Sequence, residues 1–461
     1  MTDTPINSTT DEAADEALSP AYVRAVVDAV DRGDRAQARE LVLPLRPADT
    51  AELLELLRSD ERRDLIDMLG SDLNPEVLSE LDESVRDHVM ELLDPKDIAA
   101  ALTEMDSDDA VYLLEDMDEH EQREILDQLP ASDRAVLEQS LDYPEYSAGR
   151  LMQRELVAVP PFWNVGHTLD YLREAEELPH EFYEIFVVDA AHKPIGTVPL
   201  SRVTRSKRPV TISEIMETEQ TLIPVAMDQE DVALQFSKYD LISAAVVDEE
   251  GRLVGVITVD DIVEVISEEA AEDIRLLAGV GEEAISDTVL QTSRSRVPWL
   301  AVNLVTAVIA ASVIALFDAA IEQMVALAVL MPIVASMGGN AGTQTMTVTV
   351  RALATRDLVH FNARRTILRE MLVGLLNGMI FAILLGCIGG LIFQNAWLGG
   401  VLAAAMMINL VVAGLIGILV PLGLDKLGAD PAVSSAVFVT TTTDVVGFFA
   451  FLGLAALVLF Y

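Results

Sequence analysis

The sequence of 461 residues has only one cysteine, Cys387, and far fewer basic than acidic residues. A single cysteine excludes a disulfide framework and a cysteine-based metal site. None of the five lysines follows a glycine, so no G-x-x-x-x-G-K-[ST] phosphate loop is present, and no His-Glu-x-x-His segment occurs. We therefore expect neither enzyme chemistry nor ATP-driven pumping.

Positive charge is scarce, and the charge is unevenly distributed. Residues 296–461 hold seven acidic and seven basic residues, so the whole formal charge of −44 lies in residues 1–295. Such an acidic excess argues against nucleic acid as a partner, because nucleic acid attracts basic surfaces. The N-terminus has no apolar signal-peptide core, and we expect residues 1–18 to form a disordered tail.

The C-terminal third consists of long apolar runs. Crossing the hydrocarbon core of a bilayer takes roughly 20 apolar residues in a helix. Five segments meet this length, which predicts an all-α membrane domain over residues 297–461. The predicted spans are 298–317, 324–350, 371–393, 397–420 and 432–461.

The charges of the predicted loops indicate an orientation. Residues 351–370 contain five arginines, and basic residues concentrate in cytoplasmic loops. Arg294 and Arg296 precede the first span, Lys426 lies in the loop before the fifth, and the other two loops have no basic residue. We therefore expect the N-terminal body in the cytoplasm and the C-terminus outside.

Asp444 is the strongest functional candidate, because a charge deep inside a membrane span costs about 2.5–3.5 kcal/mol on insertion scales. It follows four threonines, Thr440 to Thr443, which can line a pore or hydrogen-bond to helix carbonyls. No basic residue lies within a predicted span to pair with Asp444. We therefore expect Asp444 to line an ion path.

The second predicted span contains a polar, glycine-rich segment. Small residues let helices approach closely, so plain packing is the alternative to ion binding. Asn377 and Asn409, in spans three and four, are expected to form interhelical hydrogen bonds rather than bind ions. Oxygen ligands with no histidine in any span favour Mg²⁺, with Ca²⁺ or Mn²⁺ as competitors. The candidate oxygen-bearing residues of span two are Gly338, Gly339, Asn340 and Gln344.

The soluble body has two predicted parts. Residues 19–141 repeat a theme of Pro or Ser with Asp before a leucine-rich turn, as at residues 45–51 and 93–99, which predicts a superhelical stack of short helices. Residues 147–210 and 211–264 then form a tandem α/β repeat of βαββα units, with matching segments about 60 residues apart. Residues 265–296 predict a charged connecting helix that is too polar to span a membrane.

This order of parts resembles the MgtE-type magnesium channels over nearly the whole chain. The resemblance rests on two motifs in the membrane domain. They are Pro332 with S-M-G-G-N-x-G-x-Q at 336–344, and D-P-A at 430–432 with Thr440, Thr441, Asp444 and Gly447. It implies a helical N-domain, a pair of CBS domains, a plug helix and five spans in a bacterial inner membrane.

The resemblance also implies a homodimer with the pore on its two-fold axis. Asp444 would hold hydrated Mg²⁺, which suits an ion that sheds water reluctantly. Asp430 would lie at the cytoplasmic mouth of the pore, and Thr440 and Thr441 along it. Cytosolic Mg²⁺ would close the channel by binding carboxylates of the N-domain, CBS pair and plug. The candidate sensor residues are Asp248, Glu249, Glu250, Asp260, Asp261, Glu268, Glu269, the remaining plug acids, and the run Asp106, Asp108, Asp109, Glu115, Asp116 and Asp118.

CBS domains also bind adenosine nucleotides through a G-h-h-[ST]-x-x-D element. The second repeat has this element, with Thr258 and Asp261 in its polar places. The first repeat has Pro199 and Arg202 instead, so we expect at most one regulatory ATP site in each chain.

Two other functions remain open. A broader divalent carrier would pass Co²⁺ or Mn²⁺ as well as Mg²⁺. A membrane-anchored sensor of metal or nucleotide would use its spans only to dimerise, and Asp444 would then be inert. The depth of Asp444 in the fifth span favours transport over the sensor.

Overall fold

The computed structural model describes residues 18–115, 117–175, 178–179, 182–280, 289–356, 358, 363–433 and 435–459. The predicted tail, residues 1–18, therefore lies almost wholly outside the described residues. The chain divides into two compact units, the first reaching Ser267 and the second beginning at Glu268. Each unit is described by itself.

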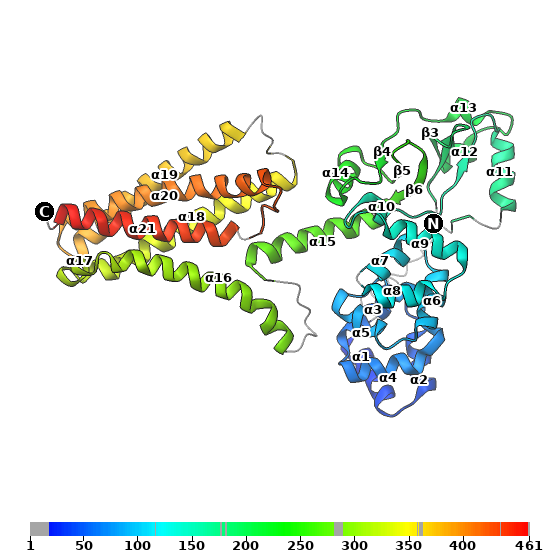
Figure 1. Ribbon diagram of the computed structural model, residues 1–461, viewed down its shortest axis with the longest axis horizontal. Helices are drawn as coiled ribbons and strands as arrows, with labels where there is room; N and C mark the ends of the chain where they lie inside the picture. The colour runs from blue at the N-terminus through cyan, green and yellow to red at the C-terminus, as the bar shows by residue number, and fades with distance from the viewer. Residues whose placement is uncertain are drawn as a thin grey trace, which may run out of the picture. The chain divides into compact units, whose positions relative to one another are not determined.

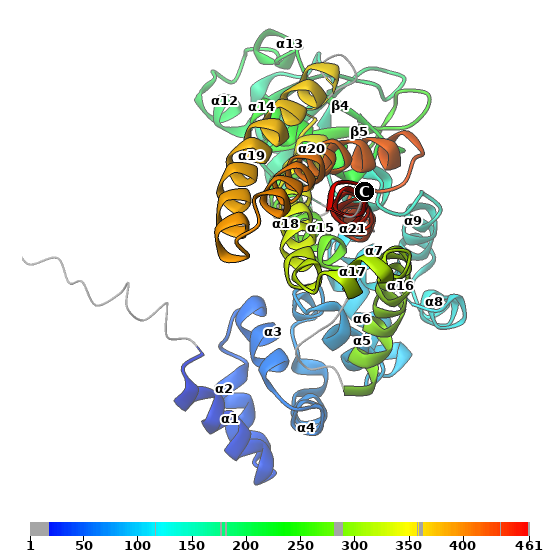
Figure 2. The same cartoon turned by 90° about the vertical axis from the view of Figure 1, so that its left-hand side faces the viewer.

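The first unit begins with a stack of short helices (Figures 1 and 2). Their apolar faces share one core, which includes Val26, Leu54, Leu65 and Leu114. Pro47 and Pro95 stand at the first turns of two of these helices, where a missing N–H costs nothing. The helices are α1 (Pro20–Asp31), α2 (Arg35–Val42), α3 (Pro47–Leu56), α4 (Ser59–Leu69), η1 (Gly70–Asp72), η2 (Pro75–Val77), α5 (Glu83–Met90), α6 (Pro95–Glu104), α7 (Ser107–Glu115), α8 (Glu119–Leu126) and α9 (Ala131–Leu141).

The predicted helical N-domain is thus confirmed as an all-helical stack. The local theme did mark helix starts, since α3, α6 and α7 begin at its Pro or Ser residues. Pro occupies the first helical position, and the preceding residues Arg46 and Asp94 make no side-chain capping hydrogen bond.

Two α/β repeats complete the first unit. In each, a short first strand pairs parallel with the second, and the second pairs antiparallel with the third. The apolar residues of β2 and β5 are buried, as central strands require. In chain order, residues 147–210 hold α10 (Ala148–Leu151), β1 (Ala158–Val159), α11 (Val165–Glu174), β2 (Glu184–Val188), β3 (Pro194–Pro199) and α12 (Leu200–Arg205), and residues 211–258 hold α13 (Ile212–Ile215), β4 (Leu222–Pro224), α14 (Gln229–Tyr239), β5 (Ser243–Val247) and β6 (Leu253–Thr258).

The tandem βαββα prediction is therefore confirmed. The last helix of the second repeat, α15 (Val259–Ala278), continues into the segment predicted as the connecting helix. The next helix, α16, begins at Val289, so the charged pattern over 265–296 is not one continuous helix. The physical reason lies at Gly279, whose φ of 67° ends α15 in the left-handed region that glycine tolerates. Glu282 and Glu283, two of the predicted plug acids, lie outside the described residues.

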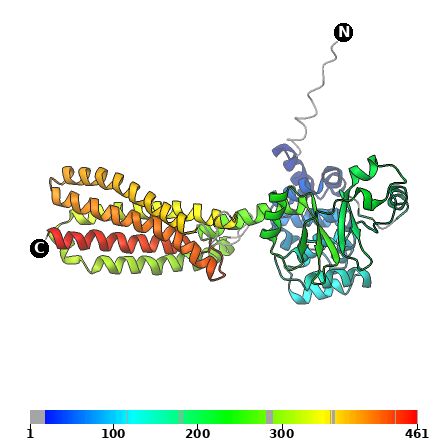
Figure 3. The same cartoon turned by 90° about the horizontal axis from the view of Figure 1, so that it is seen from above.

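Among its described residues, the second unit contains five helices that are long and apolar enough to cross a membrane, as predicted. Figure 3 shows them running side by side. The helices are α16 (Val289–Ala315), the short α17 (Asp318–Gln323), α18 (Ala326–Ala354), α19 (Ala363–Ile392), α20 (Ala396–Lys426) and α21 (Ser435–Leu459).

The central helix of this bundle is α20. It packs against α18, α19 and α21 (Figure 2), and 56% of its most apolar window is buried, against 6% for α16. The most exposed of the five helices, α16, presents its apolar residues outward, as a helix facing lipid or a partner does. The predicted pore helices α18 and α21 both lie directly on α20.

Candidate functional site

The two helices predicted to line an ion path pack against each other in the structure. A Cβ atom at Gly339 of α18 would lie 3.9 Å from both Thr440 and Thr443 of α21. A Cβ at Gly342 would come within 2.5 Å of Val439, so glycine is required there for the close approach. The structure thus brings the glycine-rich segment beside the threonines that precede Asp444.

The threonine hydroxyls donate their protons within α21. Thr440 donates to the carbonyl oxygen of Ala436 at 2.8 Å, and Thr441 donates to that of Val437 at 2.6 Å. Thr443 is fully buried and also donates one turn back, to Val439. The sequence left open whether these threonines line a pore or hydrogen-bond to helix carbonyls, and the structure contains the hydrogen bonds. Because each hydroxyl donates its proton to a carbonyl, its lone pairs remain as weak ligands for a cation.

Asp444 is half-buried near the middle of α21. Within the part of the chain described here, its carboxylate has no hydrogen bond and no basic partner. A carboxylate in that position stays charged only if water, a cation or another chain compensates it. The geometry therefore suits a site for a hydrated cation.

Asn340 and Gln344, predicted as oxygen ligands, are exposed on α18. They are separated by four residues and so lie on one face of the helix. Polar amides do not face lipid without cost, so this face requires water or a second protein surface. Gly338 is buried beside α20 and presents no surface of its own.

Asp430 lies just before α21 and is exposed, with its Oδ1 accepting a hydrogen bond from the backbone N–H of Ala432 at 2.6 Å. Burial, and then the charges of Asp430 and Glu272, raise the pKa of Asp273 on α15. Leu276 and Leu277 of the same helix pack against the core that includes Met346 and Val439. The end of α15 therefore sits at the mouth of the helix pair formed by α18 and α21.

A second acidic cluster lies in the first unit, where α7 meets the start of α15. Burial, and next the charge of Asp261, raise the pKa of Asp108 well above its usual value. Burial and the charges of Asp261 and Asp106 raise the pKa of Asp109 to about 7. Burial raises the pKa of Asp261 to about 6, although a hydrogen bond from Thr258 opposes the shift. Like charges are thus held together at this junction.

These carboxylates do not form a closed metal site. Among the described residues, no group of three or more His, Cys, Asp or Glu side chains is placed to hold a metal ion directly. Asp108, Asp109 and Asp261 are each partly accessible to solvent. The arrangement suits a cation that keeps its waters, as Mg²⁺ does.

The other predicted sensor residues lie elsewhere. Asp248, Glu249 and Glu250 form the turn between β5 and β6, at the opposite end of β6 from Asp260 and Asp261. Asp248 and Glu250 pair with Arg252, and the backbone N–H of Arg252 lowers the pKa of Asp248. The structure therefore separates the predicted group 248–250 from the pair 260–261.

The remaining described candidates lie on α15, on α7 and just before α8. Glu268 and Glu269 lie on α15, beyond the acidic cluster. Glu115 of α7 forms an ion pair with Arg150 at 3.2 Å, and Asp118 precedes α8. Asp116 lies outside the described residues.

Glu155 is a functional candidate that the sequence reasoning missed. Its Oε2 accepts hydrogen bonds from the backbone N–H of Ser107 at 3.3 Å and from the Ser107 hydroxyl at 2.8 Å. Ser107 begins α7, so Glu155 ties the second half of the unit to the helix that carries Asp108 and Asp109. No local pattern distinguishes Glu155 from other surface acids.

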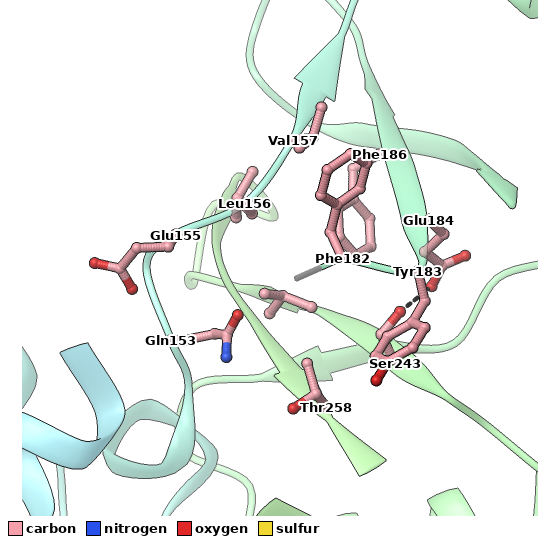
Figure 4. A pocket seen from close by; sticks show the side chains of 11 residues that line it. Gln153, Glu155, Leu156, Val157, Phe182, Tyr183, Glu184, Phe186, Ser243 and Thr258 are labelled. Atoms are coloured by element: carbon pink, nitrogen blue, oxygen red, sulfur yellow. Dashed lines mark hydrogen bonds between the residues drawn. The ribbon is translucent and has the colours of Figure 1, made fainter. Parts of the chain in front are cut away.

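A small, partly open pocket lies between the two α/β repeats, and Figure 4 shows its lining. Phe182, Tyr183 and Phe186 supply aromatic surface, and Thr258 stands at one end. Thr258 donates its hydroxyl proton to Asp261 at 2.8 Å. The predicted nucleotide residues are therefore in contact, and Thr258 lines the pocket.

Within the described part of the first repeat, the matching positions, Pro199 and Arg202, hold no such pair. Arg202 forms an ion pair with Glu217 and donates to the carbonyl oxygen of Ile215 at 3.0 Å. This agrees with the expectation that the first repeat departs from the nucleotide element.

One buried polar residue of the membrane unit was also missed. Glu370 was assigned to a loop, but it lies in α19, buried, paired with Arg369 at 2.9 Å and near Thr345. The spacing of Glu370, Gly374 and Gly378 places all three on one face of α19, and this spacing could have indicated that Glu370 is buried. Asn409 is fully buried and forms the interhelical hydrogen bond predicted for it, whereas Asn377 forms none among the described residues.

Comparison with known families gives three matches. Residues 331–454 match the MgtE divalent cation transporter family, residues 45–146 match the MgtE intracellular N domain, and residues 212–268 match the CBS domain. The first match contains both motifs of the membrane unit, and the second contains the acidic run of α7.

Individual relatives are similar over most of the chain. The magnesium transporter MgtE of Thermus thermophilus is 36% identical over 73% of this chain and 75% of the relative. The magnesium transporter MgtE of Enterococcus faecalis is 33% identical over 70% of this chain and 72% of the relative. A crystal structure of the cytosolic domain of the Mg²⁺ channel MgtE in complex with ATP is 31% identical, with a TM-score of 0.49, and covers 53% of this chain and 99% of that structure.

Proposed function

The chain belongs to the MgtE family of divalent cation transporters, and we propose that it conducts Mg²⁺ across a membrane between α18 and α21. It is a multi-pass membrane protein of a transporter family rather than an enzyme family. The observation that carries the proposal is Asp444, a carboxylate in the middle of a spanning helix with no partner among the described residues. Relatives named as magnesium transporters support Mg²⁺ as the ion.

Hydrated Mg²⁺ is the species that the path would pass. Asp444 supplies one negative charge, and the lining of α18 and α21 supplies carbonyls, hydroxyls and amides rather than nitrogen or sulfur ligands. Such oxygens bind hard cations that retain water. Asp430 and Asp273 would raise the local concentration of cations at the mouth.

A homodimer would complete the path. Asn340 and Gln344 expose amides on one face of α18 within the membrane unit. A second copy of α18 and α21 across a two-fold axis would cover this face and bring two Asp444 carboxylates toward one ion. Five spans with arginines around residues 351–369 support a cytoplasmic N-terminal body and a C-terminus outside, in a bacterial cell membrane.

Cytosolic Mg²⁺ would close the path by binding the acidic clusters. Asp106, Asp108, Asp109 and Asp261 repel one another at the junction of α7 and α15, as the raised pKa values of Asp108, Asp109 and Asp261 indicate. Two carboxylates roughly 8 Å apart repel by about 2 kcal/mol at an effective dielectric of about 20. A bound cation removes this repulsion and favours the closely docked form.

The energies needed for such a gate are moderate. Changing a gate from mostly open to mostly closed takes about 5.5 kcal/mol of differential binding. One site at ten times its dissociation constant supplies about 1.4 kcal/mol, so about four weak sites suffice. The clusters at α7 and at Asp273 with Asp430 would supply such sites, without strong binding at any one of them.

ATP is a proposed regulatory ligand. The aromatic side chains of Phe182 and Tyr183 would receive the adenine ring, and Thr258 would contact the ribose. We expect one such ligand in each chain, because the first repeat has Arg202 at the position where the nucleotide-binding element requires a carboxylate.

The proposed function is tested by flux into liposomes that contain the purified full-length protein. Mg²⁺, Ca²⁺, Mn²⁺ and Co²⁺ are offered one at a time with a fluorescent indicator inside. Selective Mg²⁺ entry supports the proposal, whereas comparable entry of Co²⁺ or Mn²⁺ indicates a broader divalent carrier. Absence of any flux from well-folded protein would leave the sensor as the better account.

A further inference from the structure

Asn409 occupies an unusual position in the membrane unit. It lies near the midpoint of α20, the central helix, and none of its surface is exposed. Its Nδ2 donates to the carbonyl oxygen of Val334 on α18 at 2.8 Å. Its Oδ1 is buried and accepts no hydrogen bond within the described chain.

Two glycines of the neighbouring helices make room for this amide. A Cβ atom added at Gly338 of α18 would overlap the Asn409 side chain. A Cβ at Gly447 of α21 would lie 2.8 Å from Nδ2 of Asn409, closer than real Cβ atoms come. The amide therefore lies between α18 and α21, which run beside α20 in Figure 2.

Stability alone does not account for this arrangement. A buried acceptor without a partner is costly, and a leucine of similar size would avoid that cost in an apolar bundle. The sequence instead keeps asparagine and leaves both facing positions without side chains. Both contacts adjoin the ion path, because Gly338 precedes Gly339 and Gly447 follows Asp444 by one turn.

We propose that Asn409 is a positioning residue for the ion path: its amide sets the spacing of α18 and α21 and thereby places Asp444 opposite the glycine-rich segment. The inference rests on the proposed function. It predicts that Asn409 affects which ions pass and at what concentration, and not only whether the protein folds.

The test compares Asn409→Leu with Asn377→Leu in the full-length protein in liposomes. Asn377 is half-buried on α19 and has no hydrogen bond within the described residues, so the same substitution there is a matched control. For Asn409→Leu we expect about tenfold loss of the Mg²⁺ to Ca²⁺ flux ratio and a raised half-saturating Mg²⁺ concentration, with little change in melting temperature. Asn377→Leu should match the wild type in both.

A second pair of variants separates the hydrogen bond from packing. Gly447→Ala alone should disturb the helix spacing, because its methyl group meets Asn409. Combining it with Asn409→Ala removes that overlap, so the double variant should melt near the wild type. If the amide positions the path, the double variant still loses selectivity; if Asn409 only fills space, its selectivity returns.

The outcomes are distinct. Wild-type selectivity in folded Asn409→Leu, or in the double variant, overturns the inference while leaving the proposed function intact. Failure of all Asn409 variants to fold assigns the residue a structural role and also overturns it. Absence of Mg²⁺ flux in the wild type overturns the proposed function, and this inference with it.

Discussion

Glu155 accepts two hydrogen bonds from Ser107, one from the backbone N–H and one from the hydroxyl, at 3.3 and 2.8 Å. Ser107 opens α7, and the next two residues are Asp108 and Asp109 of the acidic cluster. Glu155 also lines the pocket between the α/β repeats. One carboxylate therefore connects the helical stack, the acidic cluster and the pocket within the first unit.

Glu155→Ala should weaken the docking of α7 against the repeats. Losing these charge-assisted hydrogen bonds costs about 2 kcal/mol of docking free energy. If about four Mg²⁺ ions drive closure, this cost raises the Mg²⁺ concentration for half-closure roughly twofold. The measurement is flux into liposomes as a function of Mg²⁺ on the side of the soluble body. Glu138→Ala, which removes an exposed carboxylate of α9, is the control and should leave the midpoint unchanged. An unchanged midpoint for Glu155→Ala would contradict the proposed role of docking.

Low pH should partly replace Mg²⁺ at the acidic cluster. The pKa values of Asp109 and Asp261 are raised to about 7 and about 6 by burial and neighbouring charges. Because the docked form raises these carboxyl pKa values, docking is most stable when the groups are protonated. This contribution to stability is fully present below the ordinary pKa of 3.8 and is lost as the pH rises through 6 to 7. Protection of the body from limited proteolysis without Mg²⁺ should therefore increase as the pH is lowered from 8 toward 5. Protection that is independent of pH would contradict this assignment.

Neutralising the cluster should have the same effect as lowering the pH. In Asp109→Asn with Asp261→Asn, two charges are removed, so the body should resist proteolysis at pH 8 without Mg²⁺, and added Mg²⁺ should increase protection little. Asp64→Asn is the matched control, since Asp64 is exposed on α4, outside the cluster. If the double variant still needs as much Mg²⁺ as the wild type, the ions bind elsewhere.

Asp273→Asn should make closure less dependent on Mg²⁺. Burial and the charges of Asp430 and Glu272 raise the pKa of Asp273, so its ionised form disfavours the packing of α15 at the mouth. The amide removes this repulsion, and the closure curve should become shallower and begin at lower Mg²⁺. Asp425→Asn, at the exposed end of α20, controls for a general loss of negative charge. A wild-type closure curve for Asp273→Asn would remove this site from the gate.

Thr258→Ala should weaken ATP binding about fivefold, the value of one hydrogen bond of about 1 kcal/mol. Calorimetric titration of the full-length protein in detergent measures this directly. Thr204→Ala is the control, because the Thr204 hydroxyl donates to the carbonyl oxygen of Ser201 in the first repeat and does not line the pocket. Equal ATP affinity in wild type and Thr258→Ala would exclude the pocket.

The parts of the fold that follow local chemistry were predictable. Apolar length predicts the five spans, strand periodicity predicts the tandem repeat, and Pro47 and Pro95 mark helix starts. Asp444 could be singled out because a membrane charge is costly wherever the chain folds. The ends of helices were harder to predict from the sequence. Because four polar residues shortly precede Glu370, the sequence reasoning placed it in a loop, whereas α19 begins at Ala363.

The sites that depend on distant contacts could not be predicted. Ser107 and Glu155 are 48 residues apart, and Val334 and Asn409 are 75 apart, so no local pattern joins them. The sequence reasoning named both Asp248 and Asp261 as sensor candidates without assigning them to sites, and β6 holds them at opposite ends. Which carboxylates meet is decided by the packing of α7 on the repeats, and hydrophobic patterning does not encode that packing.

The central claim is that Asp444 forms the ion path and that the acidic body closes it. The most direct measurement is Mg²⁺ flux into liposomes by wild type and Asp444→Asn, with Mg²⁺ varied on the side of the soluble body. The account predicts wild-type flux that declines as this Mg²⁺ rises, and loss of most flux in Asp444→Asn despite folding and an oligomeric state like those of the wild type. Undiminished flux in Asp444→Asn would contradict the proposed path, and wild-type flux indifferent to Mg²⁺ would contradict the proposed gate.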